Sequence, residues 1–155
     1  NGIVNMEKHN EIKQLISSVL DRGYLTTLAI MDEGGVWACD VIYIYDDDLN
    51  IYWMSDPDAR HSQAIMKRNQ IAGTITVSGQ GENNLGIQFS GTAERIEGAR
   101  YDLTKKHFLK RRKPIPHEDV DVLEGDSWYI LKPQLVELIH EELYEFDKQK
   151  WVAEE

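Results

Sequence analysis

The chain has 155 residues, with 27 acidic and 17 basic side chains and a formal net charge of −10 at neutral pH. This length predicts a single domain over residues 1–155, and a hydrophobic content of 41% is enough for a packed core. The acidic balance argues against nucleic-acid binding, because phosphate contacts dominate that affinity. No apolar run reaches the roughly 20 residues needed to cross a bilayer, so we expect no membrane segment.

Cysteine and histidine are sparse. Cys39 is the single cysteine, so no internal disulfide can form, and the five histidines show no metal-ligand spacing. No cationic-then-apolar segment opens the chain, so we expect no signal peptide and a cytoplasmic protein. Residues 1–5 are interpreted as a cloning remnant or a flexible leader. Residues 142–155 are interpreted as a C-terminal extension that packs on the surface or on a partner.

The first third of the chain reads as a helix followed by a hairpin. Apolar residues recur at three- and four-residue intervals across Met6–Arg22, which predicts an amphipathic helix that Gly23 terminates. Tyr24–Met31 and Val36–Tyr45 are rich in β-branched and aromatic residues. A glycine-containing turn separates these two runs, so they predict a β-hairpin.

The next segment predicts a strand, a helix and a second strand. The first strand begins at Ile51, and Asp56-Pro57-Asp58 is typical of a helix start, with a capping carboxylate and an early proline. Arg60 and His61 then lie in the first helical turn. Exposed N–H groups and partial positive charge at that turn favour a phosphate or another small dianion, so these residues form a candidate cradle.

The remaining elements are three. Leu85–Ile96 predicts a strand bent at Gly91, and Glu97–Arg112 predicts a short helix. Trp128–Ile139 predicts a last strand, in which Pro133 marks an edge position or a bulge. About six strands joined mostly as hairpins, with one helix crossing between the third and the fourth, favour a small barrel over a doubly wound sheet.

Three segments carry a family resemblance: VWACDVIYIYDDDLNIYWMS, SDPDARHSQAIMKRNQIAGTI and GIQFSGTAERI. Over roughly Leu15 to Glu141, the chain resembles the pyridoxamine-5′-phosphate-oxidase-like, FMN-binding split-barrel superfamily, and within it a small, poorly characterised bacterial branch. The resemblance implies a mainly β fold, namely a six-stranded antiparallel split β-barrel with an N-terminal helix and a crossover helix. It also implies a homodimer with FMN at the dimer interface.

By position, the resemblance places Arg60 and His61 at the FMN phosphate and Gln88 on a flavin-contacting strand face. The residues implied to bind the cofactor are Ala38, Cys39, Asp40, Val41, Met54, Ser55, Arg60, His61 and Gln88. Ala38 and Tyr43 stand where the oxidase has a phosphate-binding Arg and Lys. The substrate-binding Arg and His elements of the oxidase have no counterpart, so pyridoxamine 5′-phosphate oxidation is not expected.

Several alternatives stay open at this point. Arg60 and His61 are either the phosphate cradle or a solvated helix start, and Asp40 faces either solvent or the cofactor cleft. The basic run 105–113 is either a solvated helix face or an anion or nucleotide site. The leading function is FMN-dependent redox chemistry on an unidentified small molecule. The alternative is a non-enzymatic split barrel that holds another ligand, for example haem on His61 or His140.

Overall fold

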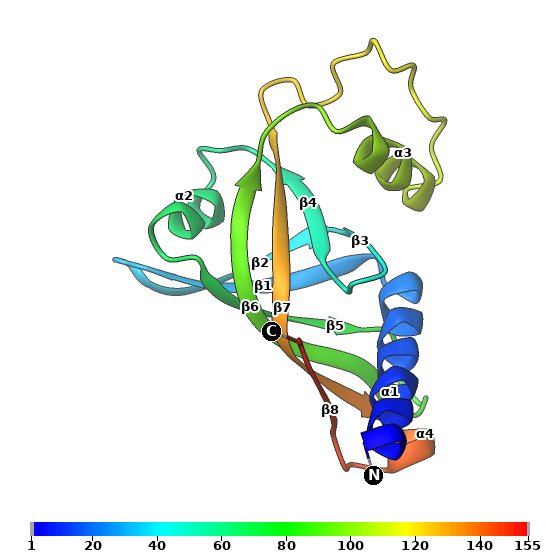
Figure 1. Cartoon of the computed structure of the whole chain (residues 1–155). Helices are drawn as coiled ribbons and strands as arrows, with labels where there is room; N and C mark the ends of the chain where they lie inside the picture. Colours follow the sequence, from blue (N-terminus) through cyan, green and yellow to red (C-terminus); the bar gives the residue numbers. More distant parts are fainter. Residues whose placement is uncertain (1, 155) are drawn as a thin grey trace.

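The computed structural model describes residues 2–154 and is mainly β (Figure 1). Its strands are β1 (Leu25–Asp32), β2 (Gly35–Ile42), β3 (Ile44–Tyr45), β4 (Ile51–Ser55), β5 (Gln70–Thr76), β6 (Leu85–Ile96), β7 (Ser127–His140) and β8 (Gln149–Val152). Its helices are α1 (Gly2–Arg22), α2 (Arg60–Lys67), α3 (Tyr101–Lys110) and α4 (Glu141–Tyr144). The predicted mainly β class, N-terminal helix and crossover helix are confirmed.

The strands form one curled antiparallel sheet in the order β2-β1-β5-β6-β7-β4-β3, with β8 added on β7 (Figure 1). Strands β6 and β7 are the longest, with 12 and 14 residues, and extend from one end of the molecule to the other (Figure 1). Every strand pairing is antiparallel. This is the split β-barrel that the family resemblance implies.

The sheet has eight strands where six were expected, for two physical reasons. The predicted strand Val36–Tyr45 breaks at Tyr43, whose ring is fully buried and whose hydroxyl donates to the Leu20 carbonyl at 2.6 Å. On either side of this break the chain changes partner, since β2 pairs with β1 and β3 pairs with β4. The second addition is β8, which lies in the predicted C-terminal extension and pairs with β7.

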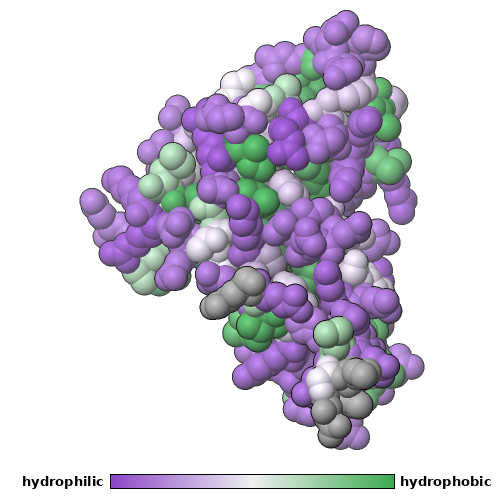
Figure 2. All heavy atoms as spheres, in the orientation of Figure 1, coloured by the Kyte–Doolittle hydropathy of each residue, from purple (hydrophilic) through white to green (hydrophobic). Residues whose placement is uncertain are grey.

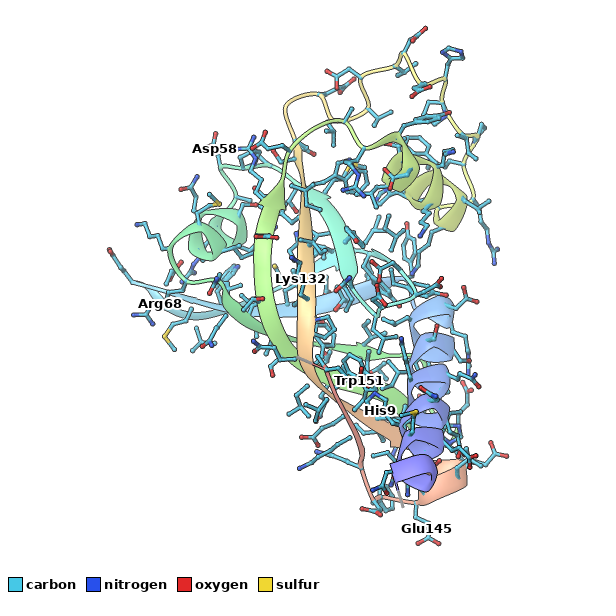
Figure 3. All side chains as sticks on the ribbon, viewed as in Figure 1. His9, Asp58, Arg68, Lys132, Glu145 and Trp151 are labelled. Carbon is cyan, nitrogen blue, oxygen red and sulfur yellow. The ribbon has the colours of Figure 1, made fainter. Side chains whose placement is uncertain are left out.

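Helix α1 closes one side of the barrel. It begins at Gly2, four residues before the predicted start, and buries Ile12, Ile16 and Leu20 in the main core. Trp151 of β8 packs against its outer part, with its ring centroid 5.8 Å from that of His9 (Figure 3). A polar-looking C-terminal extension is thereby attached to the fold through one buried aromatic side chain.

The predicted irregularity near Pro133 is a β-bulge. The β6–β7 register shifts between Ser90 and Gly91, and Pro133 pairs with Gly91. A Cβ on Gly91 would collide with the Lys132 carbonyl and lie 2.8 Å from the Pro133 Cα, so only glycine fits at this crossing. The bulge bends both long strands and lets one sheet serve both halves of the barrel.

The start of α2 differs from its prediction. Asp56 closes a turn instead of capping the helix: its carboxylate accepts the Asp58 N–H at 2.9 Å, and its carbonyl accepts the Ala59 N–H at 3.0 Å. Ala59 is the N-cap and offers no side-chain hydrogen bond. The three-residue delay arises because a short acidic side chain followed by proline stabilises a turn as readily as a helix. Arg60 and His61 nevertheless occupy the first helical turn.

Among residues 2–154, no helix is both long and apolar enough to span a bilayer. On the face seen in Figure 2, hydrophilic side chains predominate and hydrophobic ones form separate patches between them.

Candidate functional site

Arg60 lies in a corner between α2 and the β1–β2 hairpin, which we call the α2 corner and define by Asp32, Trp37, Ser55, Arg60 and His61. The Arg60 guanidinium binds the Asp32 carboxylate through two hydrogen bonds of 2.7 and 2.9 Å. It also stacks 4.4 Å from the centroid of the Trp37 ring. The hydrogen bonds from Arg60 lower the pKa of Asp32, so this carboxylate stays ionised. The positive charge of Arg60 therefore already has a partner.

His61 and Ser55 form the second contact of the corner. The His61 Nε2 lies 2.9 Å from the Ser55 Oγ, which connects the end of β4 to the first turn of α2. Partial burial lowers the pKa of His61, so the imidazole is neutral at neutral pH. The corner thus offers a neutral imidazole and a paired guanidinium.

Unpaired donors complete the start of α2. The Gln63 N–H donates to the Ala59 carbonyl at 3.0 Å, so the N–H groups of Arg60, His61 and Ser62 lie ahead of that first helical bond. Ser62 is fully buried and its hydroxyl has no hydrogen-bond partner within residues 2–154. Sequence reasoning missed Ser62, although a serine directly after Arg60-His61 was visible as a third donor. Such donors suit an anion at this turn.

The strand β2 divides its four candidate residues between two faces. Ala38 pairs with Ala29 and Asp40 with Thr27, all of them on the outer face of the sheet. The Thr27 hydroxyl donates to the Asp40 carboxylate at 2.6 Å, which places this acid on the exposed side. Cys39 and Val41 point inward instead.

The two inward residues pack with the core. Val41 is buried, and Cys39 is partly buried against the main hydrophobic cluster. Burial and the neighbouring Asp40 raise the pKa of the Cys39 thiol, which makes it a weak nucleophile at neutral pH. Neither side chain reaches the surface that carries Ala38 and Asp40.

Gln88 lies on the same outer face, two strands away from β1. It pairs with Thr74 of β5 and accepts a hydrogen bond from the Lys148 ammonium at 3.2 Å. A cavity of about 420 Å³ adjoins it, with Thr74, Phe146 and Lys148 in its lining. The outer sheet face therefore joins three of the candidate residues without any of them contacting the α2 corner.

Small side chains occupy the centre of this outer face, and apolar ones surround them. The small residues are Thr27, Ala29, Ala38, Ala72, Thr74 and Ser90. The exposed apolar residues on the same face are Leu25, Met31, Val36 and Val152. A cavity of about 360 Å³ lies over the strands where Ala29, Ala72 and Ser90 meet. Because these central side chains are small, another planar group or another sheet can approach the backbone of this face closely.

Met54 lies apart from the other candidates. It packs partly buried against the second hydrophobic cluster, which contains Leu103 and Trp128. It also lines a cavity of about 620 Å³ beside Phe108 and Leu123, on the α3 side of β4. The nine candidates thus fall into four places: the α2 corner, the outer sheet face, the core and the underside of α3.

The histidines considered as haem ligands both have polar contacts. His61 is bound to Ser55, and the Nδ1 of His140 accepts the Leu143 N–H at 3.3 Å. Within residues 2–154, no three His, Cys, Asp or Glu side chains come together in a way that could hold a metal ion.

The curled antiparallel sheet, with helices at its openings, defines the class of this protein: it has the pyridoxamine-5′-phosphate-oxidase-like split-barrel fold. General Stress Protein 26 of Bacillus anthracis superposes with a TM-score of 0.68 at 14% identity, covering 92% of this chain and 98% of that one. A putative pyridoxamine 5′-phosphate oxidase of Listeria innocua superposes with a TM-score of 0.65 at 10% identity, covering 83% of this chain and 98% of that one. A heme binding protein of Mycobacterium smegmatis gives 0.63 at 17% identity, covering 90% and 56%.

Sequence similarity identifies the family within this class. No family model matches the chain. The UPF0306 protein YhbP of Escherichia fergusonii is 32% identical over 119 residues, which cover 74% of this chain and 76% of the relative. The chain belongs to the UPF0306 family. The bacterial branch that the sequence motifs suggested is confirmed at this level.

Proposed function

We propose that the protein is a homodimer that binds FMN at its subunit interface and uses it for redox chemistry on a small molecule. A bound flavin would supply hydride-transfer chemistry, while the chain would bind and orient the flavin and keep water from it. Pyridoxamine 5′-phosphate is not the proposed substrate. We also propose a cytoplasmic location, in keeping with the single Cys39.

The observation that carries this proposal is the outer sheet face. Ala38, Asp40 and Gln88 lie on it together, although Gln88 comes from a different strand. The side chains of Ala29, Ala72 and Ser90 are small, so a planar flavin ring could lie directly against the backbone of these strands. The exposed Leu25, Met31 and Val36 around them provide apolar area that a second subunit would bury.

The α2 corner fits the phosphate end of such a cofactor. Three first-turn N–H groups and His61 supply donors to an anion. Arg60 would contact the phosphate only by sharing its guanidinium with Asp32, which competes for the same N–H groups. We therefore propose a functional but weakened phosphate site, in which Asp32 sets the affinity.

Asp32 also supports a second candidate function, a non-enzymatic split barrel that holds another ligand. A bidentate acid on Arg60 lowers the affinity for any phosphate, and one structural neighbour is a heme binding protein. His61 and His140 would each have to give up a hydrogen bond to ligate haem iron. The visible absorption spectrum separates the two candidates, since flavin absorbs in the blue and haem gives a Soret band.

The decisive experiment is a titration of the full chain with FMN and with riboflavin, which lacks the phosphate. Arg60→Ala should weaken FMN binding by about ten- to a hundredfold and leave riboflavin binding nearly unchanged. Arg68→Ala is the matched control: Arg68 is an exposed arginine at the other end of α2 whose guanidinium contacts the Met31 sulfur (Figure 3). Equal losses of FMN affinity in the two variants, or an unchanged FMN affinity in Arg60→Ala, would contradict the assignment of the phosphate site to the α2 corner.

The dimer is tested separately by light scattering. Val36 is 73% exposed at the margin of the outer sheet face, so Val36→Glu should favour the monomer and weaken FMN binding together. Val120 is 54% exposed away from this face, and Val120→Glu should change neither. A wild-type protein that stays monomeric at micromolar concentration would contradict the interfacial site.

A further inference from the structure

A further cavity lies away from the outer sheet face and the α2 corner, and we call it the basic pocket. It has a volume of about 700 Å³ and opens between the C-terminal end of α1, strand β3 and the C-terminal end of α3. Five cationic residues line it: Arg22, Lys106, Lys110, Arg111 and Arg112. Ala38, Arg60, Gln88 and the other residues of the proposed cofactor site do not reach it.

The charges of this pocket are not compensated by ion pairs. None of its five cationic side chains lies within 4.0 Å of a carboxylate among residues 2–154. Two acids also line the pocket, but Asp21 accepts the Tyr45 hydroxyl at 3.2 Å, and Asp47 sits in the turn after β3. The excess of positive charge stands out in a chain whose net charge is −10. Acidic residues outnumber basic ones in the sequence, so the amino-acid composition alone does not explain a cluster of unpaired cations around one cavity.

Lys110 is the innermost of these cations. Its ammonium lies 3.5 Å above the centroid of the Tyr43 ring and donates to the Leu20 carbonyl at 3.4 Å. Lys106 likewise donates to a backbone carbonyl, that of Tyr45, at 3.3 Å. A partly buried ammonium held only by a carbonyl and an aromatic face has donors left over, and it gains most from an anion.

We infer that the basic pocket binds a small organic phosphate of nucleotide size. The volume falls within the range of about 300–1,000 Å³ that small-molecule sites occupy. Lys106, Lys110 and Arg112 would contact the phosphate oxygens, because arginine forks and lysine ammonium groups both suit that group. The half-exposed Tyr24 and the exposed Leu109 offer apolar area to the organic part.

Titrations with pyrophosphate, ADP and adenosine test this inference by calorimetry on the full chain. Wild-type protein should bind pyrophosphate and ADP saturably and adenosine far more weakly. The double variant Lys106→Gln/Arg112→Gln removes two exposed pocket cations and should weaken both phosphates by about tenfold or more. Both side chains are exposed, so we expect unchanged circular dichroism.

The matched control is Lys105→Gln/Lys113→Gln. It removes two exposed cations from the same segment that do not line the pocket, and it should change affinity by less than about twofold. Arg60→Ala should leave pyrophosphate binding unchanged, which separates this site from the proposed FMN site. Three results would each overturn the inference: no saturable binding to the wild type, equal losses in both double variants, or a loss in Arg60→Ala equal to that in the pocket variant.

Discussion

The α2 corner and the basic pocket both present cationic side chains, but they differ in how the charges are compensated. Arg60 is held by the bidentate Asp32 and by the face of Trp37. In the basic pocket, Lys106 and Lys110 donate only to backbone carbonyls, and no ion pair forms there within residues 2–154. A cation that is paired with a carboxylate must share or lose that contact before it can bind an anionic ligand, whereas an unpaired cation can bind one directly. The residue types alone do not distinguish these two states.

Giving the basic pocket its own carboxylate should remove the difference. Leu109 lines the pocket and is 70% exposed, so Leu109→Glu should fold normally. A glutamate there would pair with Lys106 or Arg112 and repel phosphate, which should weaken pyrophosphate binding by about a hundredfold. Calorimetry measures the effect, and Leu109→Gln controls for the lost apolar contact. Equal losses with Glu and Gln would show that charge is not the cause.

The buried histidine of α3, His107, should make the pocket side of the molecule acid-sensitive. His107 is buried, and its Nδ1 has no hydrogen-bond partner among residues 2–154. Burial together with the nearby Arg111 and Lys110 lowers its pKa to about 4. Below the ordinary histidine pKa of about 6.5, the unfolded chain takes up a proton that the folded chain refuses until about pH 4. Stability is therefore full above pH 6.5 and falls as the pH drops towards 4.

The expected loss from His107 alone is on the order of 2 kcal/mol between pH 8 and pH 5. Urea unfolding at these two pH values measures it. His107→Phe keeps an aromatic ring against Trp128 and should remove most of this pH dependence. The same slope in the variant would place the acid sensitivity elsewhere, for example at His61.

Removing the competing acid from the α2 corner should make it resemble the basic pocket. Asp32→Asn keeps the shape of the side chain but frees the Arg60 charge, so FMN should bind about tenfold more tightly. Riboflavin binding should stay the same, because riboflavin has no phosphate. Fluorescence titration of both flavins gives the comparison. An unchanged or weaker FMN affinity in Asp32→Asn would show that Asp32 positions Arg60 for the phosphate.

The smallest expected effect is the pH dependence of the basic pocket. Burial lowers the pKa of Lys110 to about 8, while the Asp21 carboxylate of α1 opposes that shift. Its other ionisable neighbours are Tyr43, whose ring lies under the ammonium, His107 on the same helix, and Tyr45, Asp47 and the other cations of the pocket. A bound phosphate would raise this pKa. The contribution of Lys110 to affinity should then be complete below pH 8 and fade as the pH rises through the bound-state value.

Pyrophosphate affinity should fall about threefold between pH 7 and pH 9, as measured by calorimetry. Lys110→Arg keeps the charge over this range and should flatten the profile. If pyrophosphate affinity fell equally steeply with pH in Lys110→Arg, a group other than Lys110 would be responsible for the pH dependence.

Much of the fold could be predicted because local patterns agree with it. The alternation in Leu85–Ile96 predicted β6 at its observed bounds. Pro133 predicted either an edge position or a bulge, and the structure has the bulge, since β7 is paired on both sides. The strand break at Tyr43 could not be predicted, since it depends on the distant Leu20 carbonyl. Strand β8 was missed because its sequence is mostly polar, and only its pairing with β7 and the burial of Gln149 and Trp151 hold it in place.

The candidate site was predicted less completely. The motif S-D-P-D-A-R-H-S correctly located Arg60 and His61 at the start of α2 and Ser55 beside them. Strand parity alone could not assign Asp40 to a face, because that assignment needs the register with Thr27. Whether the nine candidates act together at a cofactor stays a prediction.

By itself, the sequence determined the order of strands and helices and the places where cations gather along the chain. Hydrophobic periodicity and turn residues act over a few positions, so they can be read locally. Only the tertiary structure decided which cation acquires a carboxylate. Arg60 binds Asp32, which lies 28 residues away in the sequence, and Lys110 donates to the Leu20 carbonyl, which lies 90 residues away. Charge compensation depends on distances between side chains that only the folded chain brings together. For this reason Arg60 in the α2 corner has a carboxylate partner, whereas the cations of the basic pocket have none within residues 2–154.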